Sequence, residues 1–405
     1  MAKQKGNEKQ FTRRDFIKAG GAALASMAFL NAIGCTKATT ITETAASTAT
    51  KTSTVTATAT STATITSTAT TTTTATTTAT ETLVVRPTTH VITDMAGRHV
   101  TLPTTISRIA TIGSVGVLNG FIFAMGQADK MVTGLPPRFD VPSWKYQYVV
   151  APNIKDLPKV QGSDDAPNVE ELLKASPEIV FTMSLPTVTQ MENANLATVY
   201  LSWTQPEDVK QCITLLGEIF GEDERAKAYI QYFNETLARI KAITDAIPDN
   251  DRVRCFYGTL SGLSNPHSIS EWWIEAAGGV SVTKDIHTSE SVTVHSEDMM
   301  IWNPQVIFLS APNEFSVAET DIRFTQLEAI KNKRYYIVPK GVHVWGNRNI
   351  EQPLTVLWAG AKLYPQAFKD VDIYAEVKNF YARFFDTVIT SDQVDEILSG
   401  DITSF

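Results

Sequence analysis

From residue 89 onward, short apolar runs alternate with stretches in which apolar residues recur every three or four positions. Apolar runs bounded by turn residues indicate buried strands, and the three-to-four spacing indicates helices that pack by one face. Strands are expected at 108–113, 130–135, 178–183, 197–203, 252–258, 305–311 and 334–339, and helices at 117–126, 168–176, 271–279, 296–303, 324–330, 352–363 and 371–385. This alternation predicts mostly parallel sheets covered by helices on both faces.

One helix in the middle of this pattern is unusually long. A first helical stretch ends at Gly221, and a second runs from residue 222 to about 247, where Pro248 follows. Its apolar positions fall at spacings of three and four, at Ala226, Ile230, Phe233, Leu237 and Ile240. At about 1.5 Å per residue such a helix is roughly 38 Å long. The strand and helix pattern restarts after it, which predicts two similar three-layer α/β lobes joined by one long rigid helix.

The N-terminal part has a different character. Residues 12–18, TRRDFIK, resemble the twin-arginine export signal, and an uncharged run follows that is too short for a permanent membrane span. The segment ending at Cys35 resembles a lipobox, although Ala32 stands where leucine is preferred, so Cys35 is the expected lipidation site. The alternative is cleavage nearby and release of a soluble protein. Residues 36–82 are almost entirely Thr, Ala and Ser, and such a segment is expected to be a disordered stalk.

These observations divide the chain into six expected segments. They are a signal (1–34), a stalk (35–88), an N-terminal lobe (89–221), a connecting helix (222–248), a C-terminal lobe with closing helices (249–390) and a tail (391–405). The N-terminal lobe begins with a hairpin signal, an alternating pattern on both sides of the turn Ala96-Gly97.

Composition and charge exclude several classes of protein. The net charge of −8 and the absence of a basic stripe in the body argue against nucleic acid as a partner. Three cysteines exclude a disulfide-rich scaffold, and the remaining two, Cys212 and Cys255, are expected to be buried thiols, with a bond between them as the alternative. Six scattered histidines do not form a metal-ligand spacing, so no intrinsic metal or cofactor is expected. No motif pairs a nucleophile with a base, and an enzyme is not expected.

The order of several segments resembles a known family. DMAGRHVTLP, RIATIG, FAMGQADKMVTGL, LPKVQG and NVEELLKASPEIVF occur in sequence, followed by EAAGGVSV, SEDMMIWNPQVIFL, FTQLEAIKNKRYYIVP and LWAGAKLYPQAF. Together they are similar to the helical-backbone substrate-binding proteins of ABC importers for iron–siderophore complexes, haem and cobalamin. The resemblance covers about residues 90–370.

The resemblance implies a docking role for one glutamate in each lobe. In this family such glutamates meet arginines of the permease, and by position they are Glu170 and Glu297. Each stands in the first turn of an expected helix that precedes a proline and a strand. The alternative is that both only favour the helix dipole, which is worth roughly 0.3–1 kcal/mol each. Glu171, three residues after Asn168, is interpreted as part of a helix cap.

A ligand is expected beyond the carboxyl ends of the strands, where open α/β sheets bind their ligands. The loops there offer aromatic rings and arginines, which suit a large and partly flat anionic chelate. The candidate cleft residues are Ser114, Arg138, Trp144, Tyr146, Tyr148, Tyr257, Trp345 and Arg348. For each aromatic residue, the alternative is ordinary packing in the core or at the rim.

The resulting hypothesis is a monomeric, lipid-anchored receptor on the outer face of the cytoplasmic membrane. It captures a ferric chelate of the siderophore type and delivers it to an ABC permease and its ATPase. A corrinoid or haem receptor of the same fold is the first alternative. A stalked structural or adhesive surface protein is the alternative from a different class, but it does not explain two lobes joined by a rigid helix.

Overall fold

The chain divides into two units, Met1–Val85 and Arg86–Phe405. The computed structural model describes residues 48–61 and 71–84 of the first unit and residues 88–405 of the second. The twin-arginine motif around Arg13 and Arg14 and the lipidation site at Cys35 lie outside the described residues.

The first unit contains a hairpin where the sequence predicted a disordered stalk. Strand β1 (Thr48–Ser61) pairs antiparallel with β2 (Thr71–Val84). In these two stretches the structure differs from the predicted disorder. Because threonine is β-branched, a threonine-rich segment has a high preference for the extended backbone. The register places threonine opposite threonine at every second pair from Thr50↔Thr82 to Thr60↔Thr72.

The N-terminal lobe contains a hairpin and a parallel sheet. Strands β3 (Thr89–Thr93) and β4 (His99–Pro103) form the predicted hairpin. The sheet has the order β5-β6-β7, from β5 (Ile109–Ile112), β6 (Ile179–Thr182) and β7 (Thr198–Tyr200). The helices of this lobe are α2 (Val115–Ala124), α3 (Lys145–Val150), α4 (Val169–Ala175) and α5 (Leu185–Asn193).

The strand predicted at 130–135 is not present. Only Met131 makes an isolated bridge, to Ile109 at the edge of the sheet. The chain then leaves the sheet, and Gly134 donates to the carbonyl oxygen of Pro158 at 2.9 Å. A Cβ on Gly134 would lie 2.6 Å from the carbonyl oxygen of Leu157, so this close approach requires glycine.

The C-terminal lobe has a four-stranded parallel sheet in the order β10-β8-β12-β13. Its strands are β8 (Arg254–Gly258), β10 (Val280–Ser281), β12 (Val306–Leu309) and β13 (Tyr335–Ile337), and β9 (Ser264–Asn265) pairs with β11 (Val292–Thr293) beside it. Its helices are α8 (Ile269–Ala276), α9 (Ser296–Trp302), α10 (Glu314–Thr320) and α11 (Glu328–Lys331). Every residue of β12 is buried.

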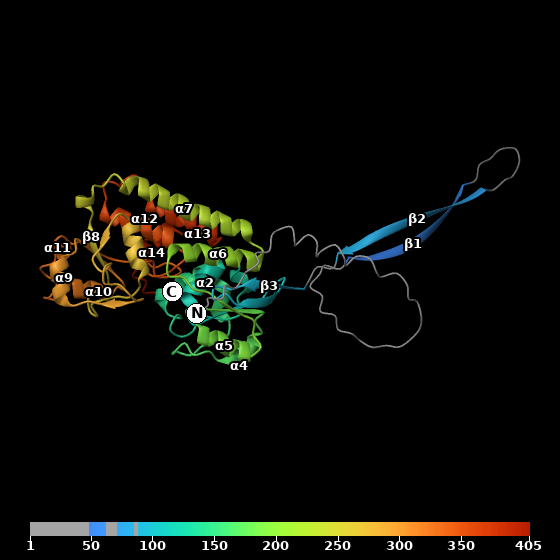
Figure 1. The fold of residues 1–405 in the computed structure, drawn as a ribbon, viewed down its shortest axis with the longest axis horizontal. Coiled ribbons are helices and arrows are strands. Elements are labelled where there is room, and N and C mark those ends of the chain that lie inside the picture. Colours follow the sequence, from blue (N-terminus) through green and yellow to red (C-terminus); the bar gives the residue numbers. More distant parts are fainter. Residues whose placement is uncertain (1–47, 62–70, 85–87) are drawn as a thin grey trace, which may run out of the picture. The chain divides into compact units, whose positions relative to one another are not determined.

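Two consecutive helices lead from the N-terminal lobe to the C-terminal lobe. Helix α6 (Pro206–Phe220) ends at Gly221, whose φ of 69° is left-handed, and α7 (Asp223–Thr244) follows at once. Figure 1 shows α7 running along the body, next to α6 and α12 (Gln352–Leu363), and its contacts with both agree. At the crossing of α6 and α7, a Cβ on Gly217 would lie 2.8 Å from that of Ala226. Glycine at this position therefore lets the two helices approach closely.

The segment predicted to be a tail forms a helix. Helix α13 (Ile373–Phe384) is followed by α14 (Ser391–Ser399), which starts with a capping box of Thr390 and Gln393 and ends at the left-handed Gly400. Val394 and Ile397 of α14 are fully buried. These side chains give the segment an apolar face to bury, so it packs on the body instead of extending from it.

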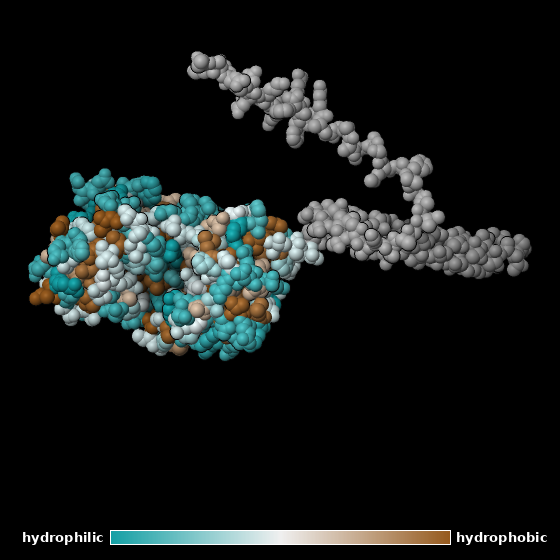
Figure 2. All heavy atoms as spheres, turned by 60° about the horizontal axis from the view of Figure 1, so that its bottom comes forward, coloured by the Kyte–Doolittle hydropathy of each residue, from teal (hydrophilic) through white to brown (hydrophobic). Residues whose placement is uncertain are grey.

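The body has one large hydrophobic core that reaches from the hairpin to α14, with smaller clusters under each sheet. Cys212 and Cys255 are buried, free thiols within it. On the face of the body that Figure 2 shows, hydrophobic side chains lie in small separate groups among hydrophilic ones. Within the described residues, no helix combines the length and the apolar character needed to cross a membrane.

Candidate ligand-binding cavity

A cavity of about 460 Å³ lies between the two lobes. The loops that follow strands β5, β6 and β13 all contribute to it, which agrees with the rule that ligands bind at the carboxyl ends of parallel strands. The lining residues are Ser114, Val117, Arg138, Phe139, Trp144 and Met183 from the N-terminal lobe, and His267, His343, Val344, Asn347 and Arg348 from the C-terminal lobe.

Each lobe places one arginine on the cavity wall and holds it with a carboxylate of its own. Arg138 pairs with Asp165 at 2.8 Å, and its guanidinium lies 4.6 Å from the centre of the Phe139 ring. Arg348 pairs with Glu290 at 3.0 Å. Both guanidinium groups keep donors for a ligand, because an arginine has five N–H groups and these contacts use only some of them.

Glu290 joins two polar residues of the C-terminal wall, His267 and Arg348. Its Oε1 accepts from Nδ1 of His267 at 2.6 Å and from Arg348. Burial opposes the charge of Glu290, but the hydrogen bond from His267 and the charge of Arg348 outweigh it and lower the pKa of this carboxyl. Glu290 is therefore ionised at neutral pH and holds the side chains of both Arg348 and His267 in place.

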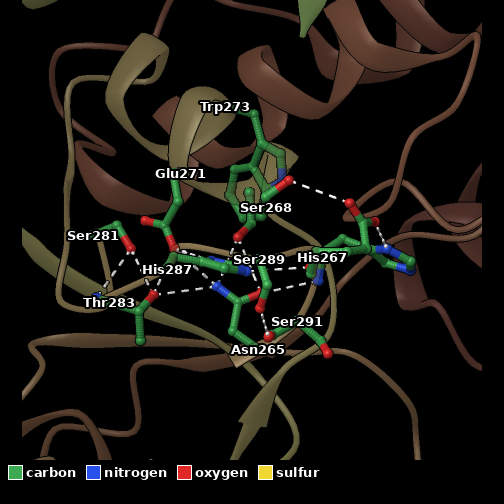
Figure 3. A network of polar contacts seen from close by, with 12 residues as sticks. Asn265, His267, Ser268, Glu271, Trp273, Ser281, Thr283, His287, Ser289 and Ser291 are labelled. Carbon is green, nitrogen blue, oxygen red and sulfur yellow. Dashed lines mark hydrogen bonds and ion pairs between the residues drawn. The ribbon is translucent and has the colours of Figure 1, made fainter. Parts of the chain in front are cut away.

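The loop that carries Glu290 is anchored on helix α8. Nδ1 of His287 lies 2.7 Å from Oε1 of Glu271, and the same oxygen accepts from Thr283 and from Asn265. Nε2 of His287 lies 3.2 Å from the carbonyl oxygen of Glu290. Figure 3 shows this network converging below α8, with His267 at its edge. The C-terminal wall is thus held by a chain of polar contacts that reaches into the lobe.

Aromatic rings form the apolar part of the wall. Trp144 packs edge-on against Phe139, with ring centroids 4.7 Å apart, and against His343 at 5.3 Å. The ammonium group of Lys340 lies 4.0 Å from the centre of a Trp144 ring. Burial lowers the pKa of Lys340 to about 8, so it remains mostly charged at neutral pH. A Cβ on Gly116 would lie 2.7 Å from the Trp144 ring, so only glycine leaves room for it.

Helix α3, which directly follows Trp144, is fixed by the C-terminal helix. Glu396 of α14 pairs with Lys145 at 2.7 Å and accepts from the hydroxyl of Tyr146 at 2.8 Å. The main-chain N–H of Lys340 donates to the carbonyl oxygen of Ile397 at 2.9 Å. Helix α14 therefore contacts both the helix that directly follows Trp144 and the loop that carries Lys340.

His343 and Glu351 lie in the same loop, and burial favours the neutral form of both side chains. Burial, together with the nearby Lys340, lowers the pKa of His343 to about 3, although its hydrogen bond to Val344 acts in the other direction. Burial also raises the pKa of Glu351 to about 7, although hydrogen bonds from Tyr381 and from the main chain of His343 oppose the rise. His343 is therefore a neutral imidazole at neutral pH.

The structure brings together four of the eight predicted cleft residues: Ser114, Arg138, Trp144 and Arg348. The other four, Tyr146, Tyr148, Tyr257 and Trp345, are not among the residues that line this cavity. The hydroxyl of Tyr146 is bonded to Glu396, and that of Tyr148 to Asp140. Trp345 is fully buried. Tyr257 is also buried, and its hydroxyl donates to Asn347 at 2.7 Å, so it supports a wall residue from behind.

His267 and Asn347 are two of the wall residues that were not among the sequence candidates. His267 stands two positions after β9, in a loop that the strand-end rule already identifies. Asn347 lies directly before Arg348, a predicted residue. The rule that located the loops could have found both, but no spacing singles out these side chains.

The predicted docking glutamates are both exposed at the starts of short helices. Glu170 pairs with Lys174 at 2.9 Å, and the helix cap is made by Asn168, which accepts from the main chain of Glu171. Glu171 also pairs with Lys174, at 2.8 Å. Glu297 lies 3.1 Å from the hydroxyl of Ser296, and Asp298 provides the cap of that helix. Neither Glu170 nor Glu297 is the capping side chain of its helix.

Residues 118–341 match the family described as periplasmic binding protein. The molybdate-binding protein MolA of Haemophilus influenzae is 26% identical over 333 residues, which are 73% of this chain and 91% of that protein. A cobalamin-binding protein of Halobacterium salinarum is 26% identical over 200 residues, 47% of this chain and 53% of that protein. The structure of a periplasmic solute-binding protein from Veillonella parvula superposes with a TM-score of 0.67 at 25% identity, covering 78% of this chain and 98% of that one.

Proposed function

This chain belongs to the periplasmic binding protein family, and from that premise we propose that it captures an anionic metal chelate, a ferric complex of the siderophore type, in the cavity between its lobes. As a member of this family it is the extracytoplasmic solute-binding component of an ABC importer, and it hands its ligand to the permease and ATPase. Its relatives are solute-binding proteins and not enzymes.

The observation that carries the proposal is the mixed wall of the cavity. Arg138 and Arg348 approach from opposite lobes and offer donors for carboxylate, catecholate or hydroxamate oxygens. Phe139 and Trp144 offer apolar area that only a ligand with an organic part can use. A cavity of about 460 Å³ suits a compact chelate better than a corrinoid macrocycle.

The proposal is tested by titrating the protein with ferric siderophores, haem and cobinamide while recording tryptophan fluorescence. Because Trp144 lines the cavity, we expect ferric chelates to quench the emission and Trp144→Phe to remove most of the response. Trp272→Phe is the control, since that residue packs on Phe233 and does not line the cavity. Quenching by cobinamide alone would refute the ferric proposal in favour of a corrinoid.

A metal oxyanion of the molybdate type is the second candidate. It is supported by the relative MolA, which is similar over most of both chains, and by the two arginines. It leaves the aromatic rings without a contact, because a small oxyanion has no apolar surface. Calorimetric titration with molybdate, tungstate and sulfate distinguishes the two candidates, since only an oxyanion receptor binds molybdate in the absence of a chelator.

Two further roles follow from the sequence. We propose that Glu170 and Glu297 meet basic residues of the permease, supported by their exposure at equivalent positions in the two lobes. We also propose that Cys35 is lipidated after export by the twin-arginine route, so that the body is held at the outer face of the cytoplasmic membrane.

A further inference from the structure

His343 offers a free ring nitrogen to the cavity. Its Nδ1 lies 3.2 Å from the main-chain carbonyl oxygen of Val344. A carbonyl oxygen can only accept, so Nδ1 carries the proton and, in the neutral ring, Nε2 carries a lone pair. The ring is half-buried, and its residue is part of the cavity wall. The structure records no hydrogen bond to Nε2 among the described residues.

This arrangement has the chemistry of a metal ligand. Histidines that bind metals generally donate the other ring N–H to a carbonyl or carboxylate, which fixes the tautomer and the direction of the lone pair. His343 meets this requirement through Val344, and its main-chain N–H is also held by Glu351 at 3.2 Å. The Trp144 ring limits rotation of the imidazole from one side.

The contact to Val344 also decides what Nε2 can do toward a ligand. With the proton on Nδ1, Nε2 has no hydrogen to donate to an oxyanion. Its lone pair can accept a hydrogen bond or coordinate a metal centre that a chelate brings into the cavity.

We infer that His343 coordinates the metal of the bound chelate through Nε2. This inference rests on the proposed function and narrows the class of ligand. Among the described residues, no three His, Cys, Asp or Glu side chains form a site that could hold a bare metal ion. The chelator must therefore supply most of the donor atoms and leave at least one position of the metal open or occupied by exchangeable water.

The inference predicts selectivity for unsaturated chelates. Nitrilotriacetate leaves coordination positions of nickel open, whereas ethylenediaminetetraacetate fills them. We expect the full chain to bind nickel–nitrilotriacetate at least about tenfold more tightly than nickel–ethylenediaminetetraacetate. His343→Ala should remove this preference, and His343→Gln should not restore it, because an amide is a poor metal ligand. The matched control is His295→Ala, an exposed histidine outside the cavity, which should leave the preference unchanged.

A spectroscopic readout separates coordination from a structural role. With copper–nitrilotriacetate and histidine labelled with nitrogen-15, we expect the electron paramagnetic resonance spectrum to show an added imidazole nitrogen that is lost in His343→Ala. If the chelates bind but the two nickel complexes bind equally, or His343→Ala keeps the preference, the inference is wrong and the proposed function stands. If no ferric, nickel or copper chelate binds the wild-type protein, both are wrong.

Discussion

Glu351 provides a quantitative test of the loop that shapes the cavity. Its side chain is fully buried, where Oε1 accepts from the hydroxyl of Tyr381 at 2.9 Å and Oε2 from the main-chain N–H of His343 at 3.2 Å. Burial raises its pKa from 4.5 to about 7. In the unfolded chain the same carboxyl loses its proton near pH 4.5, so folding disfavours its charged form.

The sign and size of the effect follow from linkage. Between pH 4.5 and about 7 the folded protein keeps a proton that the unfolded chain has released, so the free energy of unfolding falls as the pH rises. At about 1.4 kcal/mol per pKa unit, the full effect is at most about 3 kcal/mol, reached above about pH 8. Glu351→Gln cannot ionise. Relative to the wild type, its free energy of unfolding should rise by about 2–3 kcal/mol on going from pH 5 to pH 8.5.

The measurement is urea unfolding of the full chain and of Glu351→Gln at both pH values. Contributions from other groups, including His343, cancel in the difference between the two proteins at each pH. The control is Glu218→Gln, an exposed carboxyl on α6, whose difference from the wild type should not change with pH. A difference between wild type and Glu351→Gln that stays constant across this range would refute the reasoning.

The remaining predictions concern docking, anchoring and helix packing. The double variant Glu170→Ala, Glu297→Ala should no longer stimulate the permease ATPase, while its ligand affinity stays unchanged. If the variant instead loses ligand binding or its fold, the two glutamates have a structural role and not a docking role. Cys35→Ser should move the protein from the membrane fraction to the soluble fraction, and retention in the membrane would contradict lipidation. Gly217→Ala should lower the free energy of unfolding by about 1–3 kcal/mol, because its Cβ would lie 2.8 Å from that of Ala226; a change below about 0.5 kcal/mol in thermal or urea unfolding would contradict this packing.

The sequence predicted those elements whose pattern is strong over their whole length. Strand β12 is buried at every position, and α12 has the predicted bounds of residues 352–363. The run at 130–135 is equally apolar, but it is an extended segment that only touches the edge of the sheet at Met131. Apolar content shows that a segment is buried and cannot show whether its main chain pairs with a strand.

The sequence predicted which loops surround the cavity, but it did not predict which side chains of those loops line it. The strand-end rule located the loops of Trp144 and Trp345, yet one ring lines the cavity and the other is fully buried. In an irregular loop no periodicity assigns a residue to a face. The direction of Trp144 depends on the space at Gly116 and on Lys340, and that of His267 on Glu290, which lies 23 positions later. Such contacts between distant segments have no signature in the local pattern.

The contact between α14 and α3 has a consequence for how the protein folds. Lys145 and its partner Glu396 are 251 positions apart, so the wall that carries Trp144 gains this support only when the C-terminal residues are in place. Bringing two such distant residues together costs chain entropy before the contact contributes to stability. We therefore expect this contact to form more slowly than the local helices. During synthesis, the N-terminal part of the cavity therefore becomes rigid only after the C-terminal residues have been made and have packed against it. Export after folding, as the twin-arginine motif predicts, would allow that closure to be completed inside the cell.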